Sequence, residues 1–239
     1  MSLSIQTPAQ DPTACQIASL QGDEADAVWA LYQRVQATTR FGFLAQRQLA
    51  DFVQIVTGQT PGVAVGAFKN GILLGYSFSR LLRADTPLAR IFGFDAATAY
   101  EGMGSAIDAQ INGRLIMARM LALRGQIESG KGGAHVVGLI DTANLASVAN
   151  VLRSGGVLVG TRRDATSLNY VAYGGVLVQR QPDVAPETEV LVTELEAQRR
   201  LFGAGWAANG LRRKGSEQIF SFARFGSTFD PIGAQLTEV

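Results

Sequence analysis

Cysteine and histidine are almost absent from this chain of 239 residues, since Cys15 and His135 are the only ones of their kinds. A single cysteine cannot form a disulfide within the chain, and zinc sites of the common types need several Cys or His ligands. A Ser-His-Asp triad would have to use His135, which opens an apolar strand directly after a glycine turn. A histidine in that place is more typical of a structural role. We therefore expect neither a metal site nor a hydrolase triad.

A charge excess and long apolar runs are missing as well. Lys and Arg number 21 against 20 Asp and Glu, a net charge of +1, whereas proteins that bind nucleic acids usually carry a clear basic excess. No apolar run approaches the roughly 20 residues that cross a bilayer. The first basic side chain is Arg34, so the N-terminal region lacks the charged start of a signal peptide. These features predict a cytoplasmic protein that binds neither nucleic acid nor membranes.

What is present favours a globular protein with a mixed sheet. The chain is 47% hydrophobic and 17% charged, which allows a sizeable core. Asn70-Gly71 joins two segments that alternate with a period of two, the strongest short-range signal of a β-hairpin. Helical patterns lie at 23–35, 44–57, 116–129 and 145–153, and further strand patterns at 100–107, 135–140, 157–160 and 167–178. We predict an α/β fold in which helices flank a mixed, mostly antiparallel central sheet.

Proline residues divide the chain into three parts. Residues 1–14 are polar and contain two prolines, which predicts a flexible tail. Residues 15–180 carry the strand and helix patterns of the main domain. Pro182 and Pro186 mark a break, and 181–239 form a C-terminal extension with an amphipathic helix at 188–202 and an irregular aromatic and basic arm. No internal repeat is evident.

Two turns open helices in a way that suits a bound anion. Residues 110–115 lead into the helix at 116–129, and residues 141–144 lead into the helix at 145–153. The first amides of a helix lack intrahelical acceptors, and the helix dipole favours negative charge there. Gly113 allows the backbone to approach a ligand closely, and Arg114 adds a positive charge. Asn144 also suits an N-cap, with Ser147 three residues later. We expect phosphate binding at the first turn.

Two nucleotide-binding motifs are incomplete. Residues 125–132 nearly match a Walker A loop, but Gly132 stands where the magnesium-binding Ser or Thr is required, and a helix precedes the loop while a strand follows it. Gly102-Met103-Gly104 begins a dinucleotide fingerprint, but Ile107 occupies the third glycine position. A kinase-like reading would predict stabilisation by ATP with magnesium, and we expect none.

The order of elements and the two turns resemble the GNAT superfamily of CoA-dependent N-acyltransferases over about residues 23–180. The family's pyrophosphate loop, Arg/Gln-x-x-Gly-x-Gly/Ala, is matched by Gln110 and Gly113, with Leu115 at the last position. The family's Asn-x-x-Ala/Ser helix followed by Gly-Phe is similar to Asn144, Ser147 and Gly156-Val157. The resemblance implies that acetyl-CoA or another acyl-CoA is the co-substrate, with no metal, and that the thioester lies between the strands 100–107 and 135–140. It implies the following binding residues: Ile107, Gln110, Ile111, Asn112, Gly113, Arg114, Leu115, Asn144 and Ser147.

The resemblance also implies how the reaction is catalysed. A general base, often a Glu on the strand before the phosphate loop, would be Glu101. The family's usual acid is a Tyr four residues before Gly-Phe, a position that Leu152 occupies here. Tyr170 or Tyr173 is a candidate substitute, of which we select Tyr173; alternatively the thiolate leaves directly to solvent.

Two functions follow from this resemblance. The first is an N-acyltransferase that moves an acetyl or other acyl group from acyl-CoA to an amine of a small molecule or peptide. The alternative is a catalytically weak or inactive acyl-CoA-binding or regulatory module. We expect the first two helices, the loops at 38–43 and 83–97, and the extension to line the acceptor pocket. The extension could also be a packing arm or the contact of a homodimer.

Overall fold

The computed structural model describes residues 15–39, 44, 46–111, 113–164, 167–175 and 188–225, and of Arg114 only the backbone. The expected tail at 1–14, the loop at 40–43, Asn112 and the ends of the extension at 181–187 and 226–239 lie outside these residues. The described strands form one ten-stranded sheet in the order β1-β2-β3-β4-β5-β7-β6-β9-β10-β8. Its neighbours are antiparallel except β4 and β5. The mixed, mostly antiparallel fold class is therefore confirmed.

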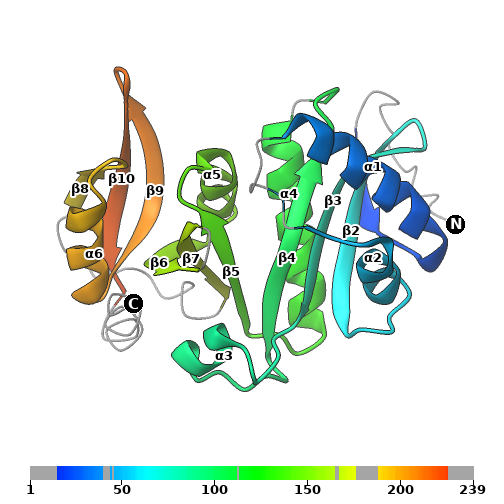
Figure 1. Cartoon of the computed structure of the whole chain (residues 1–239), viewed down its shortest axis with the longest axis horizontal. Helices are drawn as coiled ribbons and strands as arrows, with labels where there is room; N and C mark the ends of the chain where they lie inside the picture. The colour runs from blue at the N-terminus through cyan, green and yellow to red at the C-terminus, as the bar shows by residue number, and fades with distance from the viewer. Residues whose placement is uncertain are drawn as a thin grey trace, which may run out of the picture.

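The first part of the chain forms one side of this sheet and the helices around it (Figure 1). The Asn70-Gly71 hairpin is confirmed, since both residues have positive φ (53° and 75°) as a type I′ turn requires. The strand β1 was not predicted; it is a four-residue edge that pairs with β2. The elements are β1 (Gln16–Ser19), the 3-10 helix η1 (Gly22–Glu24), α1 (Ala25–Thr38), α2 (Leu49–Val56), β2 (Gly62–Lys69), β3 (Ile72–Leu81), α3 (Pro87–Phe92), β4 (Ala99–Ile107) and α4 (Gly113–Gly130).

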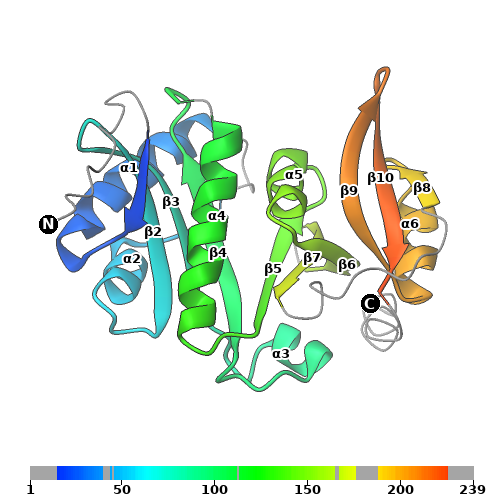
Figure 2. The ribbon, with the colours of Figure 1, turned by 180° about the vertical axis from the view of Figure 1, so that it is seen from behind.

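Helices cover both faces of strands β2 to β4. On one face, α1 and α2 bury an aromatic cluster in which Tyr32 and Phe52 pack against Tyr76 and Phe78. The other face is covered by α4 (Figure 2), whose Met120 is fully buried against these strands. The amphipathic patterns of the three helices thus have a physical cause, because each helix buries one apolar stripe.

The second part of the chain continues the sheet beyond β4. The expected helix at 188–202 is wrong at its start: residues 188–191 form a strand that pairs with β10, and the helix begins at Leu195. The expected irregular arm is also wrong in part, because 206–224 form a hairpin closed at Gly215, with φ of 63°. The elements are β5 (His135–Asp141), α5 (Leu145–Arg153), β6 (Val157–Arg163), β7 (Leu168–Gly175), β8 (Thr188–Leu191), α6 (Leu195–Gly203), β9 (Trp206–Lys214) and β10 (Glu217–Arg224).

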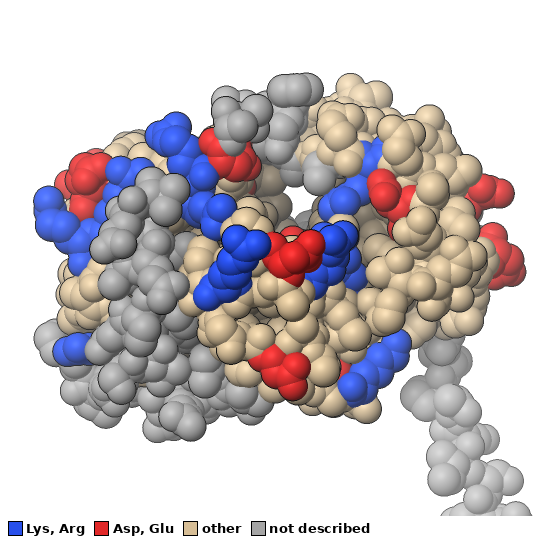
Figure 3. Space-filling view, turned by 60° about the horizontal axis from the view of Figure 1, so that its bottom comes forward, with Lys and Arg blue, Asp and Glu red and all other residues tan. Residues whose placement is uncertain are grey.

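The surface carries both signs of charge. Figure 3 shows Lys and Arg side chains interspersed with Asp and Glu side chains on one face of the molecule. Among the described residues, no helix is both long and apolar enough to cross a membrane. The interspersed charges match the near balance of the composition, 21 basic against 20 acidic side chains.

Candidate functional site

The candidate site begins where β4 and β5 separate. The two strands pair in parallel only over Ala99–Glu101 and His135–Val137 within the described residues, although β4 continues to Ile107 and β5 to Asp141. Figure 1 shows the two strands diverging toward their carboxyl ends. Leu139, on the separated part of β5, is 41% exposed. Beyond these pairs the facing edges of β4 and β5 do not pair with each other, and an extended ligand could bond to their main chains; we call this separation of the two strands the opening.

A β-bulge in β4 marks the start of this separation. Gly102 pairs with Ser79 and Gly104 with Phe78, so Met103 is the extra residue of the bulge. Gly104 has φ of +124°, a conformation that suits glycine. Arg47, in the segment before α2, donates from Nη2 to the Met103 carbonyl (2.7 Å). A bulge bends its strand and changes the direction of its main-chain groups. Arg47 holds the Met103 bulge in place from the face covered by α1 and α2.

The turn before α4 is organised by Asp108, a buried carboxylate directly after β4. Its Oδ1 accepts from the Gln110 amide (3.0 Å), its Oδ2 from Arg34 Nε of α1 (3.4 Å), and its carbonyl from the Ile111 amide (3.2 Å). The amides of Gln110 and Ile111 are thus engaged within the turn. The amides of the first turn of α4, from Gly113 to Leu115, have no intrahelical acceptor, as at every helix start.

Leu115 does not fill this turn with its side chain. It is 77% exposed, the most exposed of the large apolar side chains in the described chain. Ile107, by contrast, pairs with Gly75 and packs partly buried on the α4 face of the sheet. The Leu115 side chain therefore does not block a ligand at the start of α4.

The start of α5 forms the other wall. Asn144 is its N-cap and accepts from the Ser147 amide (3.2 Å), while Asp141 Oδ1 accepts from the Ala143 amide (2.8 Å). Helices α4 and α5 contact each other. Because both follow the carboxyl ends of the diverging strands, their N-termini lie at the same end of the opening (Figure 2). The expected binding residues of the two turns thus come from one end of the sheet.

Glu101 lies at the base of the opening, in the last pair before the strands separate. Its Oε2 accepts from Arg80 Nη2 (2.8 Å) and Nε (3.1 Å) of β3. The side chains are 21% and 29% exposed. The Arg80 guanidinium orients the Glu101 carboxylate. A proton that Glu101 accepts would bind to the carboxylate that this guanidinium also contacts.

Tyr173 shares a row of the sheet with Glu101. Val137 pairs with Glu101 on one side and with Tyr173 on the other, so two strand spacings, roughly 10 Å, separate the two backbones. Tyr173 is 1% exposed and its hydroxyl lies 2.9 Å from His135 Nδ1. His135 stacks on Phe94, with ring centroids 3.8 Å apart, and burial lowers its pKa. Glu101 and Tyr173 thus lie in one row of the sheet with one strand between them, and the tyrosine is in the core.

The other tyrosine is held elsewhere. Tyr170 is fully buried and donates from its hydroxyl to Gln198 Oε1 (3.0 Å), and burial raises its pKa to about 12. Leu152, at the position of the family's tyrosine, packs in the same core. These contacts leave Tyr173 as the better placed of the two candidate acids.

Sequence reasoning missed three residues of the site. Asp108 has a recognisable signal, since an Asp two residues before the amide that it accepts is an Asx turn. Arg47 and Arg80 carry no such signal, because their partners on β4, Met103 and Glu101, lie 56 and 21 residues away in the sequence. Within the described residues, no group of three or more His, Cys, Asp or Glu side chains is placed to hold a metal ion.

Comparison with known proteins adds a fold likeness. No protein-family model and no curated protein matches the sequence. The aminoglycoside acetyltransferase AAC(6')-Ib, solved with paromomycin and acetyl-CoA, superposes with a TM-score of 0.54 at 13% identity, over 72% of this chain and 99% of its own. A probable acetyltransferase from Staphylococcus epidermidis gives 0.56 at 10% identity, over 68% and 99%. A GNAT-family acetyltransferase from Streptococcus pneumoniae gives 0.53 at 15% identity, over 68% and 99%. This chain therefore has the fold of the GNAT superfamily.

Proposed function

We propose that this protein is an N-acyltransferase that moves an acetyl or other acyl group from acyl-CoA to an amine of a small molecule or peptide. The observation that carries the proposal is the opening between β4 and β5, which starts at a bulge and ends between two helix N-termini. Solved structures of AAC(6')-Ib, which shares the fold, hold acetyl-CoA or coenzyme A, three of them together with an aminoglycoside. An aminoglycoside is a small-molecule amine, which supports that class of acceptor.

The residues of the site have separate tasks in this proposal. The first amides of α4, from Gly113 to Leu115, would bind the diphosphate, with charge from Arg114. Asn144 and Ser147 at the start of α5 would contact the pantetheine arm in the opening. A main-chain amide beside the Met103 bulge would donate to the thioester carbonyl and stabilise the oxyanion that forms there.

The chemistry needs two proton transfers. The amine nitrogen attacks the thioester carbon, the carbon–sulfur bond then breaks, and the new amide nitrogen loses a proton while the thiolate gains one. Glu101 is the proposed base, oriented by Arg80, and Tyr173 the proposed acid. Holding the reactants in the opening would supply most of the rate enhancement.

A specific set of contacts favours the second candidate, an acyl-CoA-binding module without turnover. Glu101 is ion-paired, Tyr173 is buried, and a buried Leu152 replaces the usual acid. Binding and turnover must therefore be measured separately.

The test combines a thermal shift with a thiol-release assay. We expect CoA and acetyl-CoA to raise the melting temperature, and pooled primary amines, including aminoglycosides, to release free thiol from acetyl-CoA. Glu101→Gln should keep the thermal shift and lose on the order of a hundredfold or more in turnover, the range that a general base contributes. Stabilisation without thiol release for any amine would favour the binding module, and no stabilisation would reject both functions.

A further inference from the structure

The C-terminal extension repeats the elements that precede it. Residues 138–175, the first unit, comprise most of β5 and then α5, β6 and β7; residues 188–225, the second unit, comprise β8, α6, β9 and β10. The strand order in the sheet is β5-β7-β6 for the first unit and then, reversed, β9-β10-β8 for the second. The sequence-based expectation of no internal repeat is therefore wrong at the level of structure.

The two units correspond residue by residue with a constant offset of 50. All four pairs between β8 and β10 lie 50 residues after pairs between β5 and β7, and all six pairs between β6 and β7 recur between β9 and β10. The bulge recurs too, since the register skips Val159 in β6 and Asn209 in β9. Unrelated hairpins have no reason to share every register.

Helices α5 and α6 also have matching backbone geometry at their ends. The N-caps Asn144 and Glu194 have nearly equal backbone angles (φ −87°, ψ 63° and φ −90°, ψ 63°). The glycines after the helices, Gly155 and Gly205, have φ of 85° and 78°. Identical residues at an offset of 50 are few, which explains why the sequence did not reveal the repeat: Leu145 and Leu195, Gly155 and Gly205, Gly160 and Gly210, Arg162 and Arg212, Arg163 and Arg213.

An approximate two-fold axis relates the units. They join through β6 and β9, which pair antiparallel at Leu158 and Ala208. These two residues are themselves 50 apart, so a residue pairs with its own counterpart, as at the two-fold axis of a symmetric dimer. Each helix also contacts the joining strand of the other unit, α5 with β9 and α6 with β6.

The units share one hydrophobic core. Leu152 of α5 and its counterpart Phe202 of α6 are both buried in it. Val148 has the counterpart Gln198, whose buried amide accepts from the Tyr170 hydroxyl of the first unit. Counterparts from both units line this core: Ile140 and Val190, Leu158 and Ala208, Tyr170 and Phe220, Ala172 and Phe222.

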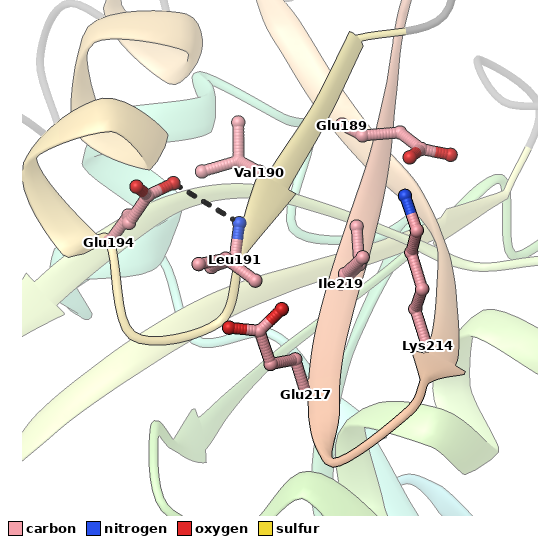
Figure 4. A pocket seen from close by; sticks show the side chains of 7 residues that line it. All are labelled: Glu189, Val190, Leu191, Glu194, Lys214, Glu217 and Ile219. Atoms are coloured by element: carbon pink, nitrogen blue, oxygen red, sulfur yellow. Dashed lines mark hydrogen bonds between the residues drawn. The ribbon is translucent and has the colours of Figure 1, made fainter.

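The end of β8 differs from its counterpart, the end of β5, in how its main chain is bonded. Asn144 accepts from an amide of its own helix, whereas Glu194 reaches back to the Leu191 amide (3.3 Å), at the end of β8 (Figure 4). Gln198 Nε2 also donates to the carbonyls of Leu191 and Val192 (2.9 Å each). In the described chain the second unit has no counterpart of β4 and α4, which carry the proposed diphosphate site.

We propose that the second unit is a copy of the first. It pairs with the first unit as the same unit of a second subunit would in a symmetric dimer, and it supports the β5–α5 wall of the site instead of forming a second site. The part that concerns the ligand rests on the proposed function. The lengths of the superposed acetyltransferases agree with an added unit. The superpositions include about 99% of each acetyltransferase but only 68–72% of this chain.

Hydrogen exchange on the full chain tests the shared core, using the matched variants Leu152→Ala and Phe202→Ala. Each should lower the melting temperature by about 10 °C and accelerate amide exchange in both units alike. Glu196→Ala, on the exposed side of α6, should change neither. Phe202→Leu serves if the alanine variant does not fold. Faster exchange confined to 188–225 in the Phe202 variant would overturn the proposal.

Exchange with and without CoA tests whether the second unit forms a site of its own. We expect CoA to protect the starts of α4 and α5 but not the start of α6. Protection at all three would overturn the assignment of the second unit as a support without a site. No protection at any of the three helix starts would contradict the proposed function. The repeat would then be tested by the Leu152 and Phe202 variants alone.

Discussion

At the scale of single residues, side chains that lie far apart in the sequence set the geometry of the opening. Arg47 holds the Met103 carbonyl at the bulge, Arg80 orients Glu101, and Arg34 of α1 bonds to Asp108 before α4. Each interaction joins an element of the first half to β4 or the residue that follows it. The site is therefore sensitive to residues that no local motif marks.

Arg47→Ala should reduce catalysis more than stability. Loss of a hydrogen bond from a charged group, about 1.5–3 kcal/mol, would let the bulge relax at the proposed thioester site. We expect kcat/KM to fall by roughly tenfold or more with a melting temperature lowered by only a few degrees. Arg83→Ala is the control, because its ion pair with Asp85 is exposed (64% and 62%). Equal effects of both variants on kcat/KM would contradict a role for the bulge.

His135→Asn should change how stability depends on pH. Burial lowers the pKa of His135, so the folded state favours the neutral ring. Its contribution to stability is complete above the unfolded-state value near 6.5 and is lost as the pH falls through the lower pKa of the folded state. Since His135 is the only histidine, the parent should lose more stability than the variant below about pH 6.5, measured by urea unfolding across pH. Parallel curves would argue against this assignment.

At the scale of elements, helix α4 is attached to the sheet by a buried polar network. Arg124 donates to Ser77 Oγ (2.9 Å) and the Phe78 carbonyl (3.2 Å), and it lies 3.1 Å from Glu128 Oε1. Glu128 in turn contacts the Ser79 hydroxyl. Burial raises the pKa of Glu128 and lowers that of Arg124. These groups position α4, whose N-terminus is the proposed diphosphate site.

The turn between β4 and α4 should depend on Asp108. Asp108→Ala removes the acceptor of the Gln110 amide and the partner of Arg34. We expect the Kd for CoA, measured by calorimetry, to rise by about tenfold, equal to about 1.4 kcal/mol. Asp108→Asn keeps an oxygen for the Gln110 amide and should lose less affinity. An unchanged Kd in the alanine variant would show that the turn holds its shape without this carboxylate.

At the scale of the whole molecule, the paired units imply equal responses at counterpart positions. Gly155 and Gly205 both have positive φ after their helices, where alanine costs about 1–2 kcal/mol. Gly155→Ala and Gly205→Ala should therefore lower the free energy of unfolding by similar amounts, about 1 kcal/mol or more, in urea titrations. Gly125→Ala within α4 has open space for its Cβ and should instead stabilise by roughly 0.5–1 kcal/mol. Unequal effects of the two capping variants would argue against equivalent caps.

The sequence by itself determined the hairpin at Asn70-Gly71 and the order from β4 to β7, because each depends on local periodicity or turn chemistry. It also identified Asn144 as the N-cap of α5, since cap effects act within one turn, whereas α4 begins at Gly113, three residues before the predicted start at 116. The division at residue 180 and the roles of the candidate binding residues remain predictions.

Only the tertiary structure decided the rest. The strand β8 was missed because four residues become a strand through pairing with β10, not through their own pattern. The repeat was hidden because register and packing recur while few side chains do. The partners of Glu101 and Tyr173 depend on which strands lie side by side, and the opening exists because β4 bends away from β5 at Met103. Such contacts join residues tens of positions apart, and no local pattern encodes them.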